Sequence, residues 1–313
     1  MNGSQRRGTA GAATAMFMVG TLTAVSATIA SYPLFGGQAV RYAVAAAVLL
    51  LVARLTGGPG ARPGPRDWLL LLALAATGLV AFNICIVEAT RDTSPATIGT
   101  VIAAVPIVLA LVGPLLERRR PAPAVVASAC VVASGAALAN GLGGGSFRGL
   151  LFSLGALAGE VCFSLLAVPL LPRLGPLRVS AYSAALAAPM LLVLGVAADG
   201  AGVLRAPTAG ELAGFAYLSA VVTTIAFLLW YDAIGRLGAD RAGLFAGLIP
   251  VSAVVTTVAL GIDRPGPADL AGAALVAAGV VVGLRARVAP REPAPPQPVT
   301  CDAAPIGIAR GSA

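Results

Sequence analysis

The chain contains no lysine and no histidine among its 313 residues, so all 21 basic residues are arginine. Histidine is the side chain that normally titrates near neutral pH, and its absence leaves only carboxylates with a shifted pKa for that role. Charged residues make up 11% of the chain and hydrophobic residues 58%, with a mean hydropathy of +0.90. A water-soluble domain carries about 25% charged residues. The composition therefore indicates a protein of the lipid bilayer.

Cysteine is also scarce, and the four cysteines (Cys85, Cys130, Cys162 and Cys301) show no paired spacing. Disulfide frameworks and zinc sites depend on such spacing, so we expect neither. The sequence also lacks a phosphate-binding P-loop, a nucleophile elbow and a dinucleotide fingerprint. We therefore predict a protein that is not an enzyme, holds no metal or cofactor, and is not driven by ATP bound to this chain.

What the chain does contain is an internal duplication, in which residues 88–135 recur without a gap at 232–279. Prolines and glycines support the alignment most strongly, because each fixes a feature of the backbone. The matched pairs are Glu88 with Asp232, Gly99 with Gly243, Pro106 with Pro250, Pro121 with Pro265, Pro123 with Pro267, and Gly135 with Gly279. The offset is much longer than the repeat of a solenoid, so two whole halves are duplicated.

Long apolar runs separated by proline and glycine predict membrane-spanning helices. A bilayer core of about 30 Å requires a helix of about 20 apolar residues. By this measure ten spans are predicted, at residues 12–30, 34–55, 67–89, 94–116, 122–140, 148–171, 178–197, 211–233, 240–260 and 268–285. The short connections between them are typical of helix hairpins.

Arginine distribution predicts the orientation, since short cytoplasmic loops accumulate positive charge. With the N-terminus inside, only Arg91, Arg148, Arg205 and Arg264 fall in outer loops, and Arg41 falls within a span. The other sixteen arginines fall on the cytoplasmic side. Both termini are then cytoplasmic, in a multi-pass protein of the cell membrane. The positive charge is explained by topology, so we expect no nucleic-acid partner.

Five spans in each half is an odd number, so the second half must enter the bilayer in the opposite sense to the first. The predicted fold is thus an all-α membrane protein with ten transmembrane helices in two inverted five-helix repeats. We assign residues 1–11 to a cytoplasmic tail, 12–140 and 147–286 to the repeats, and the proline-rich segment 287–313 to a disordered cytoplasmic tail. Inverted repeats that meet near the midplane are a recurring plan of secondary transporters.

Short motifs in both halves resemble the EamA repeat of the drug/metabolite transporter superfamily. In the first half they are Ser94-Pro95-Ala96, Val105-Pro106 and Leu116-Glu117; in the second they are Gly238-Ala239-Asp240, Ile249-Pro250 and the helix of residues 272–279. Arg41 in the second span also fits the family pattern. The resemblance implies ten helices that move small metabolites. In one departure, the second half has Gly261 where an acidic residue is expected, with Asp263 nearby.

Two charges within predicted spans are the first candidates for a binding site, because a charge at this depth costs about 2.5–3.5 kcal/mol. Glu160 lies about 18 Å into the sixth span, near the midplane. It is a candidate to carry a proton or to bind a substrate ammonium; the alternative is a structural carboxyl, protonated or paired with arginine. Arg41 is a candidate to bind a substrate carboxylate; the alternatives are an internal ion pair or hydrogen bonds to backbone carbonyl groups.

Further candidates are the residues that line or gate the pathway. Pro106 and Pro250 fall inside the fourth and ninth spans, where proline kinks a helix, either next to a cavity or only for packing. Glu88 and Asp232 fall near span ends at opposite faces, which favours structural or gating contacts. Candidates for the polar and aromatic lining are Asn83, Thr223, Thr224, Trp230 and Tyr231, although Trp and Tyr are also common at membrane interfaces.

The sequence thus predicts a secondary transporter of small amphipathic metabolites, such as amino acids or related compounds. Family resemblance favours export, and proton coupling would depend on a carboxylate. Nutrient uptake, uncoupled diffusion, an intramembrane enzyme and a non-transporting membrane partner are the alternatives. The expected partners are the small-molecule substrate and the lipid bilayer. A homodimer is open, since small-residue faces such as residues 155–159 and 271–274 permit close helix packing.

Overall fold

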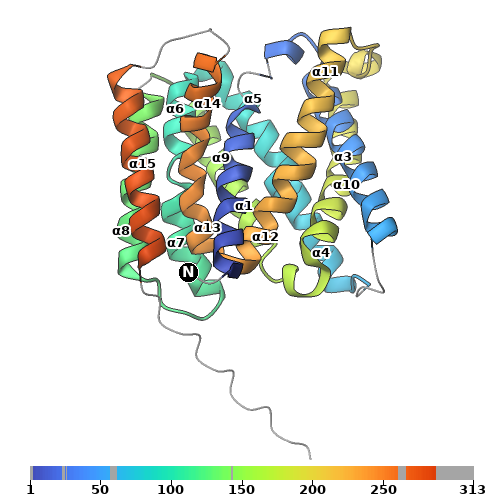
Figure 1. The fold of residues 1–313 in the computed structure, drawn as a ribbon. Coiled ribbons are helices and arrows are strands. Elements are labelled where there is room, and N and C mark those ends of the chain that lie inside the picture. The colour runs from blue at the N-terminus through green and yellow to red at the C-terminus, as the bar shows by residue number, and fades with distance from the viewer. Residues whose placement is uncertain are drawn as a thin grey trace, which may run out of the picture.

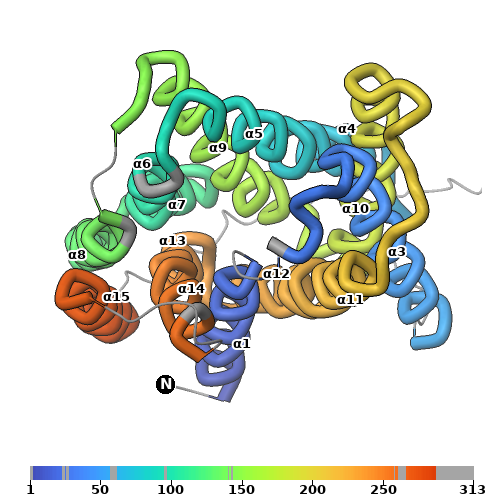
Figure 2. Tube along the Cα trace, turned by 90° about the horizontal axis from the view of Figure 1, so that it is seen from above, coloured from blue at the N-terminus to red at the C-terminus, as the bar shows by residue number. Residues whose placement is uncertain are grey.

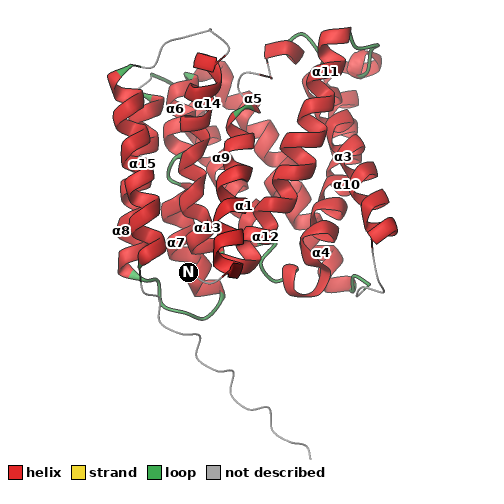
Figure 3. Ribbon diagram, in the orientation of Figure 1, coloured by secondary structure: helices red, strands yellow, loops and turns green. Residues whose placement is uncertain are grey.

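Helices account for every regular element in the part of the chain that the computed structural model describes, which is residues 3–22, 25, 27–56, 62–141, 144–259 and 266–286 (Figure 3). The predicted tail 287–313 lies outside these residues, as do Gly261 and Asp263.

The elements of the first half are α1 (Gly3–Gly20), η1 (Ala27–Ile29), α3 (Leu34–Thr56), α4 (Pro65–Leu74), η2 (Ala75–Ala81), α5 (Phe82–Asp92), α6 (Pro95–Ile102), α7 (Val105–Leu116) and α8 (Pro123–Asn140). Those of the second half are α9 (Phe147–Leu165), α10 (Leu171–Asp199), η3 (Gly200–Val203), α11 (Ala209–Tyr217), η4 (Leu218–Ile225), α12 (Ala226–Leu237), α13 (Ala239–Gly243), η5 (Leu244–Gly247), α14 (Leu248–Ala259) and α15 (Pro267–Arg285).

The structure describes eight helices long and apolar enough to cross a membrane, together with a shorter apolar helix at Pro123–Ala139. They begin at Leu34, Pro65, Thr97, Phe147, Leu171, Ala209, Ala239 and Pro267, and several are formed by consecutive elements. The chain is therefore an all-helical, multi-pass membrane protein.

The first helix differs from the prediction, because α1 begins at Gly3 instead of residue 12. Residues 3–11, assigned from the sequence to a tail, are helical. Gly8 explains part of this extension: a Cβ at Gly8 would lie 3.0 Å from side-chain atoms of Arg236 and Leu237, so the early turns of α1 pack closely on α12. Tertiary packing of this kind stabilises helical turns that the local sequence favours only weakly.

The offset of 144 residues found in the sequence also relates the helices. α1 begins at 3 and α9 at 147; α4 begins at 65 and α11 at 209; α8 begins at 123 and α15 at 267. Even irregular segments recur, since the π-helical segment η2 corresponds to the π-helical segment η4. The duplication therefore extends well beyond the stretch first recognised in the sequence.

The bundle has a helix pair at each end, with α8 and α15 at one end and α3 and α10 at the other (Figure 2). The first pair approaches very closely, because a Cβ on Gly272 would lie 2.5 Å from the carbonyl oxygen of Gly135. Between the ends, α5, α6 and α9 form one long side, and α1, α12 and α14 form the other (Figure 2). The start of α1 and the end of α15 lie at the same face of the bundle (Figure 1).

Candidate functional site

A cavity of about 310 Å³, hereafter the central cavity, lies between the two long sides of the bundle. Residues from α1, α3, η2, α5, α9, η4 and α12 line it, and many occur as pairs related by the 144-residue offset. These pairs are Met16 with Glu160, Val19 with Phe163, Gly78 with Val222, Phe82 with Ala226, Asn83 with Phe227, and Ile86 with Trp230. The cavity therefore forms where the corresponding surfaces of the two halves face each other.

Arg41 brings the positive charge to this cavity from α3, although its side chain is only 7% exposed. Its Nε donates a hydrogen bond of 2.6 Å to Thr223 Oγ1, and its Nη1 donates one of 3.3 Å to Gln38 Oε1. The guanidinium also lies 5.4 Å from the centre of the Tyr42 ring. Among the described residues no carboxylate forms an ion pair with Arg41.

Glu160 brings a carboxyl to the same cavity from α9, and it is the only acidic residue among the described residues that line it. Its side chain is partly buried. Within the described part of the chain it forms no ion pair, so it is not the partner of Arg41 in this structure. The cavity wall thus holds one cation and one carboxyl that do not neutralise each other.

Aromatic rings cover much of the remaining wall. Phe163 and Phe227 lie with ring centres 4.8 Å apart, and Tyr42 lies 6.5 Å from Phe227. Trp230 is buried and donates an Nε1 hydrogen bond of 3.2 Å to Ser164 Oγ, so its ring is fixed in the wall. Tyr231 is fully buried but does not line the described cavity; it packs behind Phe163, with ring centres 5.1 Å apart.

Asn83 lies in the wall, where its amide donates a hydrogen bond of 2.6 Å to the Leu79 carbonyl oxygen. This bond satisfies one N–H of the Asn83 amide with a carbonyl four residues earlier in the chain. The amide oxygen remains available to accept a hydrogen bond. Among the described lining residues, the side-chain polar groups are the amides of Gln38 and Asn83, the Tyr42 hydroxyl, the Trp230 indole N–H and the two charged groups. This mixture of a few polar groups with aromatic side chains is typical of a small-molecule site.

The π-helical segments η2 and η4 both contribute to the cavity, through Gly78 and Leu79 and through Val222. A π-helical turn inserts an extra residue, and such turns occur frequently at functional sites. Gly78 allows η2 to approach α9 closely, because a Cβ there would lie 2.8 Å from Phe163 Cα. Both π-helical segments therefore form part of the cavity wall, and η2 does so in close contact with α9.

A second cavity of about 480 Å³ adjoins the central one, since Ile86 and Glu160 line both. Apart from Glu160 and Thr90 its lining is apolar, with side chains from α6, α8, η5 and α14 among others. Pro250 lines this second cavity, whereas Pro106 is buried next to Val105, which lines it.

Both prolines occur where a long helix is interrupted. α6 ends at Ile102, and α7 begins at Val105, which places Pro106 in its first turn. In the second half, the 3-10 segment η5 precedes α14, and Pro250 is the third residue of α14. Proline is tolerated in a first turn because its missing N–H would have no helical acceptor there. Both prolines thus lie near a break between helical segments, and their role in gating stays a prediction.

Glu88 and Asp232 form surface ion pairs near the ends of their helices. Glu88 contacts Arg91 at 2.7 Å and Arg148 at 2.5 Å, and Asp232 accepts a hydrogen bond of 2.6 Å from Arg236 Nε. Neither residue lines the central cavity as described.

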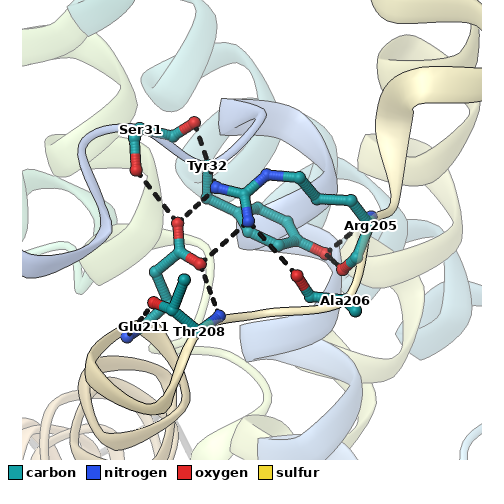
Figure 4. A network of polar contacts seen from close by, with 6 residues as sticks. All are labelled: Ser31, Tyr32, Arg205, Ala206, Thr208 and Glu211. Carbon is teal, nitrogen blue, oxygen red and sulfur yellow. Dashed lines mark hydrogen bonds and ion pairs between the residues drawn. The ribbon is translucent and has the colours of Figure 1, made fainter.

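A polar network around Glu211 holds the start of α3 and thereby the helix that carries Arg41. Glu211 accepts hydrogen bonds from Arg205 Nη1 at 3.0 Å, Ser31 Oγ at 3.1 Å and the Thr208 backbone N–H at 2.8 Å (Figure 4). The Arg205 guanidinium stacks over the Tyr32 ring, 4.8 Å from its centre. The hydrogen bond with Glu211 raises the pKa of Arg205, so this arginine keeps its charge at physiological pH.

Several residues of the site were not predicted from the sequence, notably Gln38, Tyr42, Phe163 and Phe227. Thr223 and Thr224 were predicted to line the pathway; neither is among the described lining residues of the central cavity, but Thr223 accepts the hydrogen bond from Arg41. A signal existed for two of the residues that were missed. Phe163 lies three residues after Glu160, and Phe227 lies three residues before Trp230, so each shares a helix face with a residue that was predicted. No sequence pattern pointed to the π-helical segments.

Comparison with known proteins tests the family resemblance seen in the sequence. The model of the EamA-like transporter family matches residues 6–141 and again 147–285. The chain is 24% identical over 230 residues to the uncharacterized transporter YetK of Bacillus subtilis (strain 168), which covers 71% of this chain and 70% of that protein. One solved crystal structure superimposes with a TM-score of 0.77 at 22% identity, covering 88% of this chain and 95% of the other. The resemblance seen in the sequence is thereby confirmed, and this chain belongs to the EamA-like transporter family.

Proposed function

We propose that this protein is a secondary transporter that exports small amphipathic metabolites, such as amino acids or related compounds, from the cell. The observation that carries the proposal is the central cavity, which presents Arg41 and Glu160 without an ion pair between them. A zwitterion matches this arrangement, with its carboxylate at the guanidinium and its ammonium at the carboxyl. The aromatic wall suits an apolar side chain.

The proposal includes ten spans in two inverted repeats, with both termini in the cytoplasm. Support comes from the arginine distribution and from the shared face of the start of α1 and the end of α15 (Figure 1). In this proposal, α1 and α8 cross the membrane in addition to the eight helices described above, which gives ten spans. The location of the cavity between corresponding residues of the two halves agrees with alternating access, in which two repeats rock around a fixed site.

Proton coupling is assigned to Glu160. A carboxyl at the junction of two cavities is reachable from both, and the chain contains no histidine to take this role. The Glu160 carboxylate can bind either a proton or the ammonium group of a substrate, but not both at once. As the site opens to the two sides of the membrane in turn, it would therefore carry a proton in one direction and substrate in the other. We favour transport over an intramembrane reaction, because the described wall pairs one cation and one carboxyl with aromatic side chains, an arrangement that suits binding of a zwitterion.

The test is transport by the purified full-length protein in liposomes. Vesicles preloaded with unlabelled amino acids and related compounds, one at a time, are assayed for uptake of the same labelled compound, with protein-free vesicles as control. We expect counterflow of at least one zwitterionic amphipathic compound. Correctly folded protein that moves none of a broad panel would overturn the proposal.

A further inference from the structure

We propose that Thr223 positions Arg41 as a carboxylate-binding subsite of the central cavity. The inference deepens the proposed transport function and rests on it. Arg41 is the binding group, and Thr223 acts through it. The contact joins two segments far apart in the sequence, since α3 packs against η4.

The Thr223 hydroxyl has a defined orientation. Its single proton is donated to the Leu218 carbonyl oxygen at 3.0 Å, so an oxygen lone pair is left to accept from Arg41 Nε at 2.6 Å. Thr223 is fully buried, which prevents water from replacing either bond. The hydroxyl thus fixes the Nε edge of the guanidinium against η4.

The π-helical geometry of η4 makes this orientation possible. In an α-helix a threonine hydroxyl bonds back to the carbonyl three or four residues earlier. Here Thr223 bonds back five residues to Leu218, and Thr224 bonds back five residues to Ser219 at 2.8 Å. The two threonines lie in the same segment, are both buried and make the same kind of hydrogen bond to the backbone. Of the two, only Thr223 forms a hydrogen bond with Arg41.

The rest of the guanidinium remains available to a ligand. Gln38 accepts one hydrogen bond from Nη1, and Nη2 has no hydrogen-bond partner among the described residues. A buried arginine without a carboxylate partner is costly in a bilayer, and a ligand anion would supply the missing charge. The planar fork of N–H donors matches a carboxylate, which it can bind through two parallel hydrogen bonds.

The experiment compares each carboxylate probe with its uncharged amide. Purified full-length protein in detergent is titrated with L-leucine, L-phenylalanine and hexanoate, and with leucinamide, phenylalaninamide and hexanamide, while the thermal unfolding midpoint is followed. Transport of the acids is measured in liposomes. The variants are Thr223→Val, which removes the hydroxyl at equal size, and Thr223→Ser, which keeps it. Thr224→Val is the matched control, and Thr223→Ala serves if valine does not fold.

We expect wild type to prefer the acids over the amides. Thr223→Val should raise the apparent Kd and the KM for the acids by about tenfold, equivalent to about 1.4 kcal/mol, and leave amide binding unchanged. Thr223→Ser should restore acid binding, and Thr224→Val should match wild type. A purely structural role of Thr223 would instead lower the folding yield and weaken the binding of acids and amides alike.

Other results overturn the inference in distinguishable ways. If wild type transports compounds of the panel but binds acids and amides equally, the carboxylate subsite is wrong and the proposed function stands. If Thr223→Val and Thr223→Ala both bind acids as well as Thr224→Val does, Thr223 does not position Arg41. Folded wild type that neither binds nor transports any probe contradicts the proposed function together with this inference.

Discussion

At the scale of residues, we predict that proton coupling depends on Glu160, because it is the only acidic residue among the described lining of the central cavity. Glu160→Gln keeps the size and removes the exchangeable charge. We expect substrate exchange across liposomes to continue while accumulation driven by a pH gradient disappears. Since Glu160 forms no ion pair among the described residues, the free energy of unfolding should change by less than about 1 kcal/mol.

The control for this measurement is wild type with the gradient collapsed by a protonophore, which should resemble Glu160→Gln. A variant destabilised by several kcal/mol would indicate instead an ionised Glu160 that balances a buried arginine. A variant that folds normally and still concentrates substrate would show that Glu160 does not couple protons.

Glu211 is expected to act on the site through structure alone. Glu211→Gln replaces an acceptor of the Arg205, Ser31 and Thr208 hydrogen bonds with a neutral amide, which weakens the tether on the start of α3 (Figure 4). We expect a lower thermal unfolding midpoint. Asp269→Asn is the matched control. Asp269 also accepts a hydrogen bond at the start of a helix, from the Gly266 backbone N–H at 2.7 Å, but it forms no ion pair among the described residues. Equal midpoints for the two variants would contradict the tether.

At the scale of elements, the α8 and α15 pair depends on the absence of side chains at its contact. Gly272→Ala places a Cβ 2.5 Å from the Gly135 carbonyl oxygen and 2.8 Å from the Ala139 backbone nitrogen. Because backbone cannot move aside as a flexible side chain does, we expect a destabilisation of about 1–3 kcal/mol in thermal or denaturant unfolding. Gly235→Ala on α12 is the control: nothing lies within 4 Å of its Cβ, so stability should stay equal or rise slightly.

The elements also show what sequence reasoning can and cannot supply. Apolar runs predicted membrane-spanning helices because they act through the bilayer, and the structure describes eight helices long and apolar enough to cross it. Pro106 and Pro250 lie near breaks between helical segments, since proline acts locally on the backbone. The start of α1 was missed, since contacts of Gly8 with Arg236 and Leu237 stabilise it. Within the site, Arg41 and Glu160 are conspicuous as charges in apolar runs. Thr223 is recognisable in the sequence only as one of several polar lining candidates, and Gln38 resembles an ordinary helix residue. Their hydrogen bonds with Arg41 become visible only in the three-dimensional structure.

At the scale of the whole molecule, we predict that both termini lie in the cytoplasm. The prediction depends on the distribution of arginine: sixteen of the 21 arginines fall on the cytoplasmic side. Short loops rich in arginine are retained on that side when the chain is inserted into the membrane. A reporter active only in the cytoplasm, fused after Arg287, should be active, and one fused in the loop that contains Arg205 should not. The opposite pattern would invert the whole topology.

The central claim is that substrate passes through the central cavity, and a reversible block of its wall tests this most directly. In a functional variant whose four cysteines are replaced, Ile86→Cys introduces a single thiol where both cavities meet. Leu55→Cys, at the end of α3 and 77% exposed, is the control. Each protein is modified with a methanethiosulfonate after folding, reconstituted and assayed for counterflow. Modified Ile86→Cys should fall to the level of protein-free liposomes and recover after reduction, while Leu55→Cys is unaffected; complete modification of Ile86→Cys with undiminished transport would contradict the account.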